Sequence, residues 1–261
     1  MAIRIPILMY HGLATAPDSV PAGWSTRHTL PWNEFKAQIS LLRREGWRTL
    51  LPHELTADEL APQGERILAL TFDDGHASDL LAAEHLAQAG MRATFYITWS
   101  RLGRSGYLAR GDAGRIARQG LRIGAHGLTH VAFTGLDDER LWRELHTTRV
   151  RLEDLLGTEV SDLACPFGAY DQRVLAAAFK AGYRTIMTSD FRRALIDGGC
   201  VFSRLPVFSD TSLRDFGALL HEGPLGIVRR RILAGVARRS AGWAIFAGRR
   251  GDSGPRAGVS D

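Results

Sequence analysis

Short apolar runs alternate with helix-like segments along most of the chain, and this alternation is the feature that most constrains the fold. Strand candidates such as Ile5–Tyr10, Ile67–Phe72 and Ala93–Ile97 are short and rich in β-branched or aromatic residues. Between such runs, apolar residues recur at helical spacing until a glycine follows, as Gly90 follows the helix candidate Ser78–Ala89. Repeated strand–helix units predict an α/β fold with a parallel sheet.

The number of these units favours a barrel, or a distorted barrel, over an open sheet. About seven or eight strand candidates, joined mostly by helices, fall within residues 1–210. A chain of 261 residues is long enough for one such domain with a buried core. We therefore expect a catalytic domain over residues 1–210, followed by a basic helical tail over residues 211–261 whose end is disordered.

Two adjacent carboxylates, Asp73 and Asp74, follow the strand candidate Ile67–Phe72 and precede Gly75. Neighbouring side chains in an extended segment point to opposite sides, so these carboxylates can reach different positions and do different work. The alternative is a turn whose carboxylates only cap a helix. Barrel enzymes build their active sites where the strands end, which favours a catalytic role.

His126 and His130 supply two imidazoles four residues apart, just after the strand candidate Arg122–Ala125. Residues at this spacing share one side of a helical turn and can bind one metal ion. With Asp74 as the candidate carboxylate, they would form a set that leaves positions open for water and substrate. Residue 127 is glycine and not glutamate, which excludes the zinc-protease helix pattern.

Five motifs follow one another in the chain, namely Met9–His11, Leu70–Gly75, Ala93–Tyr96, Gly124–His130 and Pro166–Tyr170. Together they resemble the polysaccharide deacetylase family, also called the NodB-homology domain or carbohydrate esterase family 4. The opening Met-Tyr-His is similar to the branch that includes exopolysaccharide N-deacetylases. The resemblance implies a distorted (β/α)7 barrel of the NodB-homology type. It also implies a hydrolase that removes N-acetyl groups from N-acetylhexosamine units of a glycan or glycan precursor.

The resemblance implies a role for each motif residue. Asp73 would be the general base that activates the attacking water. Asp74, His126 and His130 would hold a divalent metal, usually zinc. The backbone N–H of Phe167 would face the oxyanion of the tetrahedral intermediate and so contact the substrate.

The proton for the departing sugar amine has two candidate donors. Members of the Met-Tyr-His branch take it from the N-terminal histidine, which makes His11 our choice for the general acid. The alternative is His221, whose Leu-Leu-His context loosely resembles a motif of other branches. His221 is also readily explained as a surface residue on a terminal helix.

Ala164 stands where many family members carry an arginine that orients the base aspartate. We expect Arg204, at the end of the last strand candidates, to pair with Asp73 or with Asp190 instead and to serve the substrate site. An ordinary surface arginine is the alternative.

The tryptophan that the family carries after its fourth-motif aspartate is also absent, since Phe191 follows Asp190. Phe191, Phe202 and Leu205 are candidates to line the acetyl-methyl pocket, with core packing as the alternative for each. Gly127 replaces a small hydroxyl residue that is common after the first metal histidine. That change removes a local hydrogen bond without altering a metal ligand.

Two further functions compete with N-deacetylation. The same metal site could act on another acyl group, as an O-acetyl esterase does. The changes at Ala164 and after Asp190 make a catalytically weak carbohydrate-binding barrel the other alternative. Retention of the candidate base and all three candidate metal ligands argues against that second alternative.

Part of the net charge of +5 comes from arginines in the tail that alternate with apolar residues. Such a segment could lie on an anionic membrane surface, or it could be a terminal helix with a solvated face. We expect no nucleic-acid partner. The first residues lack the basic leader and cleavage site of a signal peptide. A cytoplasmic location follows, peripheral to the inner membrane face if the tail binds there.

Overall fold

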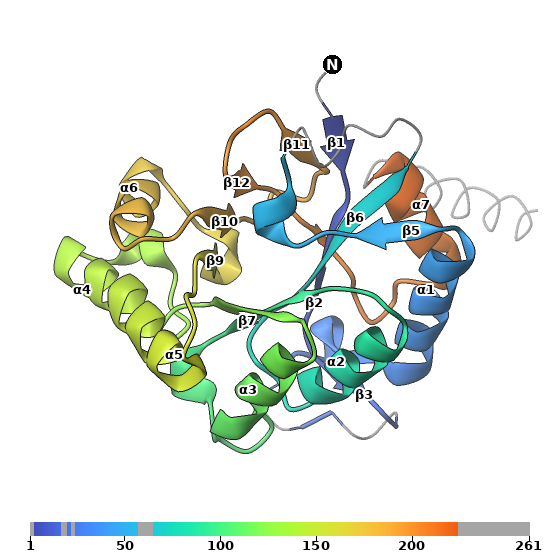
Figure 1. Cartoon of the computed structure of the whole chain (residues 1–261), viewed down its shortest axis with the longest axis horizontal. Helices are drawn as coiled ribbons and strands as arrows, with labels where there is room; N and C mark the ends of the chain where they lie inside the picture. The colour runs from blue at the N-terminus through green and yellow to red at the C-terminus, as the bar shows by residue number, and fades with distance from the viewer. Residues whose placement is uncertain (1–2, 17–19, 22–23, 57–64, 224–261) are drawn as a thin grey trace, which may run out of the picture.

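The computed structural model describes residues 3–16, 20–21, 24–56 and 65–223. A curved sheet of parallel strands lies at the centre of the described chain, and helices surround it (Figure 1). The sheet has nine strands in the order β12-β10-β9-β8-β7-β6-β2-β13, with β5 also pairing with β6. They are β2 (Ile7–Tyr10), β5 (Trp47–Thr49), β6 (Arg66–Phe72), β7 (Thr94–Ile97), β8 (Arg122–Ala125), β9 (Asp162–Ala164), β10 (Thr185–Met187), β12 (Val201–Phe202) and β13 (Leu205–Pro206).

One short segment connects the two edges of this sheet. β12 pairs with β10 at one edge, and β13 pairs with β2 at the other. Only Ser203 and Arg204 separate β12 from β13. The sheet is therefore curled into a distorted barrel with Arg204 at its seam, and the predicted barrel is confirmed.

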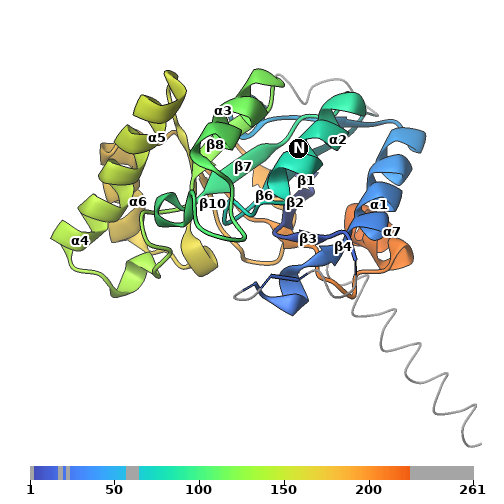
Figure 2. The same cartoon turned by 90° about the horizontal axis from the view of Figure 1, so that it is seen from below.

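Two smaller strand pairs lie beyond the ends of the barrel. β1 (Ile3–Ile5) pairs antiparallel with β11 (Ala194–Ile196). β3 (Leu13–Ala14) pairs with β4 (Leu30–Pro31) beyond the carboxyl end of β2 (Figure 2). The sequence predicted one strand over Ile5–Tyr10, but Pro6 separates β1 from β2 because its ring nitrogen cannot donate a hydrogen bond to a neighbouring strand.

Some of the helices on the outer face begin or end at caps that the sequence provides. Asp171 accepts a hydrogen bond from the Val174 N–H at the start of α6 (Gln172–Lys180), and Gly157, with a φ of 68°, ends α5 (Thr148–Leu156). A π-helical turn, η5 (Arg143–Thr147), joins α4 (Asp138–Trp142) to α5 in one continuous run. The helices are α1 (Trp32–Arg44), α2 (Asp79–Gln88), α3 (Arg110–Arg118), α4 (Asp138–Trp142), α5 (Thr148–Leu156), α6 (Gln172–Lys180) and α7 (Leu213–Glu222).

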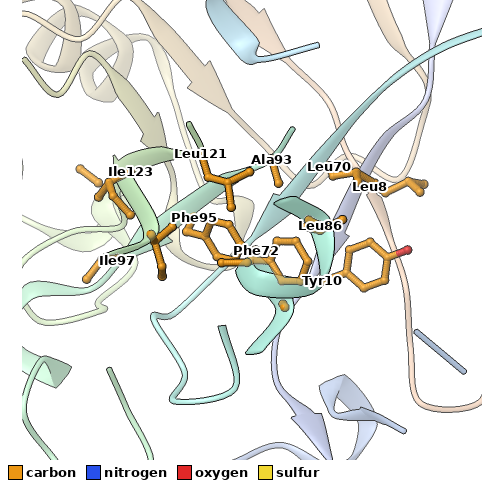
Figure 3. Close-up of a cluster of buried hydrophobic side chains, with 14 of the residues drawn as sticks. Leu8, Tyr10, Leu70, Phe72, Leu86, Ala93, Phe95, Ile97, Leu121 and Ile123 are labelled. Carbon is orange, nitrogen blue, oxygen red and sulfur yellow. The ribbon is translucent and has the colours of Figure 1, made fainter. Parts of the chain in front are cut away.

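Alternation along the strands divides the core into two layers. Outward-facing side chains pack against the helices, and Figure 3 shows Tyr10, Phe72 and Phe95 in a row among them. The ring centroids of Tyr10 and Phe72 lie 5.1 Å apart, and those of Phe72 and Phe95 lie 4.6 Å apart. Inward-facing side chains, including Ile7 and Met187, form a separate cluster inside the barrel.

α7 lies within the segment that the sequence assigned to the basic tail. Its residues Phe216, Leu219 and Leu220 are buried in the same apolar cluster as Phe35 of α1. The arginine-rich residues 224–261 lie outside the described part of the chain. Among the described helices, none combines the length and the apolar character that crossing a membrane requires.

Candidate active site

A cavity of about 380 Å³ opens where the barrel strands end. It brings together residues from several of the loops that follow the strands, which is where barrel enzymes place their catalytic groups. Every residue that the sequence assigned to the metal, the base and the preferred acid lines it. The lining includes His11, Trp24, His28, Asp73, Asp74, His76, Arg101, Tyr107, His126, His130, Phe167 and Phe191.

The three candidate metal ligands converge in this cavity. One ligand atom from each of Asp74, His126 and His130 lies within 4.8 Å of the other two. Asp74 Oδ1 is 3.0 Å from His130 Nε2 and 3.6 Å from His126 Nε2. His126 Nδ1 donates to the carbonyl oxygen of Ala164 at 2.8 Å, which leaves Nε2 free to act as a ligand. Two imidazoles and one carboxylate in this arrangement fit zinc or a similar divalent ion.

The ionisation of these groups suits metal binding. Burial lowers the pKa of His126, so its imidazole is neutral at neutral pH. Burial alone would raise the pKa of Asp74, but the neighbouring imidazoles of His130, His76 and His126 hold it well below its usual value. A neutral imidazole and an ionised carboxylate are the forms that bind metals.

Asp73, the candidate base, lies beside this set and is paired with Arg204. The guanidinium Nη1 donates to Asp73 Oδ1 at 2.6 Å, and Nη2 donates to Oδ2 at 2.7 Å. Burial would raise the pKa of Asp73, but the Arg204 charge outweighs it and the pKa is lowered. Arg204 is fully buried behind Asp73, and its Nε donates to the Thr188 carbonyl. The pairing with Asp73 predicted from the sequence is confirmed, whereas Asp190 contacts Tyr170 and Arg192 instead.

Of the two candidate proton donors, His11 lines the cavity and His221 does not. Burial lowers the pKa of His11 to about 4, and its Nδ1 has no hydrogen-bond partner among the described residues. Its ring lies 4.7 Å from the ring of His28. His221 is on α7, where its Nε2 lies 3.2 Å from Glu45 Oε2.

Backbone strain is concentrated at the cavity. In the described chain, four residues other than glycine have positive φ angles, and all four line it. Their φ angles are 82° at Asp74, 62° at His130, 59° at Phe167 and 54° at Phe191. Left-handed backbone at residues with a Cβ is unfavourable and is retained where a site needs the geometry.

The aromatic candidates separate into exposed and buried groups. Phe167 is 69% exposed and Phe191 is 54% exposed at the rim of the cavity. Phe202 is buried inside the barrel and Leu205 is buried beneath the helices, so these two pack in the core and do not line the cavity.

Sequence reasoning missed two residues that contact Asp74. His76 Nε2 lies 3.4 Å from Asp74 Oδ2, and Arg101 Nη1 lies 2.5 Å from Asp74 Oδ1. His76 follows the Asp-Asp-Gly turn directly, and its position could have pointed to the site. Arg101 comes from the turn η3 (Trp99–Arg101) after β7, and no spacing in the sequence links it to Asp74.

Comparison with known proteins agrees with this geometry. Residues 61–186 match the family model described as polysaccharide deacetylase. The chain is 29% identical over 223 residues to a Bacillus subtilis protein, YxkH, whose name describes it as a polysaccharide deacetylase. The match covers 83% of this chain and 76% of the relative. It is also 29% identical over 133 residues to a peptidoglycan-N-acetylglucosamine deacetylase of Bacillus cereus, covering 49% of this chain and 59% of that protein.

Solved structures share the fold at low identity. The Streptococcus pyogenes deacetylase PplD in complex with acetate superposes with a TM-score of 0.74 at 20% identity, covering 85% of this chain and 100% of that one. IcaB from Ammonifex degensii superposes with a TM-score of 0.68 at 20% identity, covering 82% of this chain and 96% of that one. The matched family model and the shared motifs show that residues 61–186 of this chain carry a polysaccharide deacetylase family domain, and the solved deacetylases share its barrel fold.

Proposed function

We propose that this protein is a metal-dependent hydrolase that removes N-acetyl groups from N-acetylhexosamine units of a glycan or glycan precursor. One observation carries the proposal: a set of candidate metal ligands and a further ionised carboxylate, which does not belong to that set, line the same cavity. Asp74, His126 and His130 form the set. Asp73, held by Arg204, is the additional carboxylate.

A divalent ion held by Asp74, His126 and His130 would polarise the amide carbonyl and lower the pKa of the attacking water. Asp73 accepts the proton of that water, and the two hydrogen bonds from Arg204 keep its carboxylate ionised and oriented. The backbone N–H of Phe167 donates to the oxyanion as the tetrahedral intermediate forms.

His11 delivers a proton to the departing amine. Because its pKa is about 4, the imidazole is neutral before the reaction. The proton that it delivers therefore has to arrive during the reaction. Asp73 takes it from the attacking water and passes it to His11, which returns Asp73 to its ionised form. Once protonated, an imidazole of low pKa gives up its proton readily to the amine nitrogen.

Aromatic side chains around the cavity support a sugar substrate. Trp24, Tyr107, Phe167 and Phe191 all line it, and ligand sites combine such surfaces with a few polar groups that fix orientation. Relatives in the family include the peptidoglycan-N-acetylglucosamine deacetylase above and a chitooligosaccharide deacetylase of Rhizobium leguminosarum. An N-acetylated amino sugar is accordingly the substrate that we assign to the cavity.

Release of acetate from N-acetylglucosamine oligomers tests the proposal. We expect activity that a chelator abolishes and zinc restores, and that Asp73→Asn removes. Glu139→Gln is the matched control, because Glu139 is an exposed carboxylate on α4 that pairs only with Arg143 among the contacts seen. Activity that persists with the chelator would refute metal dependence, and release from O-acetyl esters alone would favour the esterase.

We also propose that the basic C-terminal tail brings the enzyme to the inner face of an anionic membrane through its arginine-rich residues 224–261. The alternation of arginine with apolar residues after residue 224 supports this contact. Co-sedimentation with vesicles containing phosphatidylserine should decrease when residues 224–261 are deleted. Unchanged co-sedimentation would refute the membrane role without affecting the deacetylase proposal.

A further inference from the structure

A π-helical turn interrupts the helical run from Asp138 to Leu156. This turn, η5, carries a buried acidic side chain, Glu144, which is 6% exposed. π-helical turns are rare within helices and occur frequently at functional sites. Glu144 does not line the cavity, but its hydrogen bonds connect it to the candidate metal site.

The carboxylate of Glu144 binds the segment that joins the two candidate metal histidines. Its Oε2 accepts the backbone N–H of Leu128 at 2.6 Å and that of Thr129 at 3.0 Å. Its Oε1 accepts the Thr129 hydroxyl at 2.5 Å. Hydrogen bonds to a carboxylate are about twice as strong as those between neutral groups. One side chain thus holds two consecutive residues of the His126–His130 loop.

Gly127 allows this close approach. Its φ is 78°, and a Cβ at this position would lie 3.1 Å from Glu144 Oε2 and 3.2 Å from the Phe133 ring. A hydroxyl residue here would be strained and would crowd the carboxylate. The absence of a Cβ at Gly127 therefore leaves the space that the Glu144 carboxylate occupies.

The opposite side of the loop is held by the segment after β7. The Trp99 N–H donates to the Gly127 carbonyl at 3.1 Å, and the Ser100 N–H donates to the Leu128 carbonyl at 2.9 Å. Glu144 takes up the N–H groups of the loop while this segment takes up its carbonyls. Both sides of the loop are therefore hydrogen-bonded. The loop ends at His130, whose backbone is left-handed and whose Nε2 lies 3.0 Å from Asp74 Oδ1.

We propose that Glu144 is a positioning residue that fixes His130 in metal-binding geometry through the backbone of Leu128 and Thr129. It contacts neither His126 nor His130 through a hydrogen bond among the described contacts. The inference rests on the proposed metal site and adds to it the residue that sets the affinity of that site.

Zinc affinity, measured by competition with a chromogenic chelator on the full chain, tests this role. Glu144→Ala is expected to weaken zinc binding about 10-fold or more, as loss of an outer partner does at other metal sites. Glu144→Gln keeps an acceptor oxygen and should recover part of the affinity. Glu139→Gln, on the same helical run, should bind zinc as the wild type does. At saturating zinc, kcat should decrease in Glu144→Ala while KM changes little.

Wild-type zinc affinity in a folded Glu144→Ala protein would overturn the inference. If Glu144→Ala does not fold, Glu144→Gln and Thr129→Val decide it, because each removes part of the same hydrogen-bond set, and wild-type affinity in both would refute the role. The outcome is separate from the proposed function. A wild type that binds zinc without deacetylating any glycan would refute the function, while the affinity ratio would still decide the role of Glu144.

Discussion

Arg204 and Asp73, which lie 131 residues apart in the chain, form a two-pronged ion pair inside the barrel. Many family members place the arginine that orients this aspartate where Ala164 stands, at the end of β9. In this chain the guanidinium comes from the seam after β12, and both β9 and β12 pair with β10. The arginine that pairs with Asp73, the candidate base, therefore follows β12 in this chain and not β9.

Replacing Arg204 by Gln should impair both catalysis and stability. Asp73 would stay buried without its counter-charge, so its pKa would rise. In the wild type that pKa lies below the usual 3.8, so the stabilisation from the ion pair is present above pH 3.8 and is lost as pH falls through the folded-state pKa. We expect the acid limb of kcat/KM to move to higher pH and the rate to decrease about 10- to 100-fold. Unfolding in urea should show a loss of about 3–5 kcal/mol.

Arg192→Gln is the control for that experiment, because Arg192 pairs with Asp190 at the surface. Exposed pairs contribute about 0–1 kcal/mol, so its stability should barely change. An acid limb that stays in place in Arg204→Gln would contradict the orienting role.

Removing one candidate metal ligand should reproduce the effect of chelation. We expect His130→Ala to lower kcat on the order of 10³-fold, since a catalytic metal contributes several kcal/mol to the transition state. Zinc should raise the Tm of the wild type, because an ion that binds the native state stabilises it, and should leave the Tm of His130→Ala unchanged. His146→Ala, a histidine stacked on Trp142 away from the cavity, should behave as the wild type. Equal zinc-induced Tm shifts in wild type and His130→Ala would count against the ligand set.

Replacing each of the two candidate proton donors should have a different effect on kcat. His11→Ala should lower kcat about 10²- to 10⁴-fold, the usual contribution of a general acid. His221→Ala should leave kcat unchanged, since its imidazole contacts Glu45 outside the cavity. Steady-state kinetics on N-acetylglucosamine oligomers distinguish the two, and the reverse pattern would show that His11 is not the acid.

His11 should also make folding sensitive to pH. Its pKa is lowered from 6.5 to about 4, so the unfolded chain binds a proton that the native state does not. The stability that it contributes is full above pH 6.5 and decreases as pH falls from 6.5 towards 4. Urea unfolding of His11→Ala should therefore depend less on pH in this range than that of the wild type. Parallel pH dependences would contradict the lowered pKa.

The sequence was sufficient to predict the parallel barrel and, among the residues that line its cavity, the candidate base, the candidate metal ligands and the preferred acid. Strand alternation and the carboxyl-end rule place Asp73, Asp74 and His126 on one face without knowledge of any contact. Glu144 could not be found in this way, because its hydrogen bonds join a loop to a helix that follows it. The buried residues Leu141, Leu145 and Leu152 keep ordinary helical spacing, so the sequence does not reveal the π-helical turn that presents Glu144. Arg101 was missed for a similar reason, since its contact with Asp74 depends on how the turn after β7 packs.

Phe72 connects the core to the turn that carries Asp73 and Asp74, and its loss should affect both. Its ring is stacked between Tyr10 and Phe95 and has no exposed surface, and Asp73 is the next residue. Phe72→Ala should destabilise the fold by about 3–5 kcal/mol, because it leaves a cavity that the sheet and helices cannot fill. Phe179→Ala, at a residue of α6 that is 41% exposed, should cost far less. Urea unfolding of both variants measures the difference. If the losses were equal, the aromatic row under the helices would not be the packing centre that holds the Asp73 turn in place.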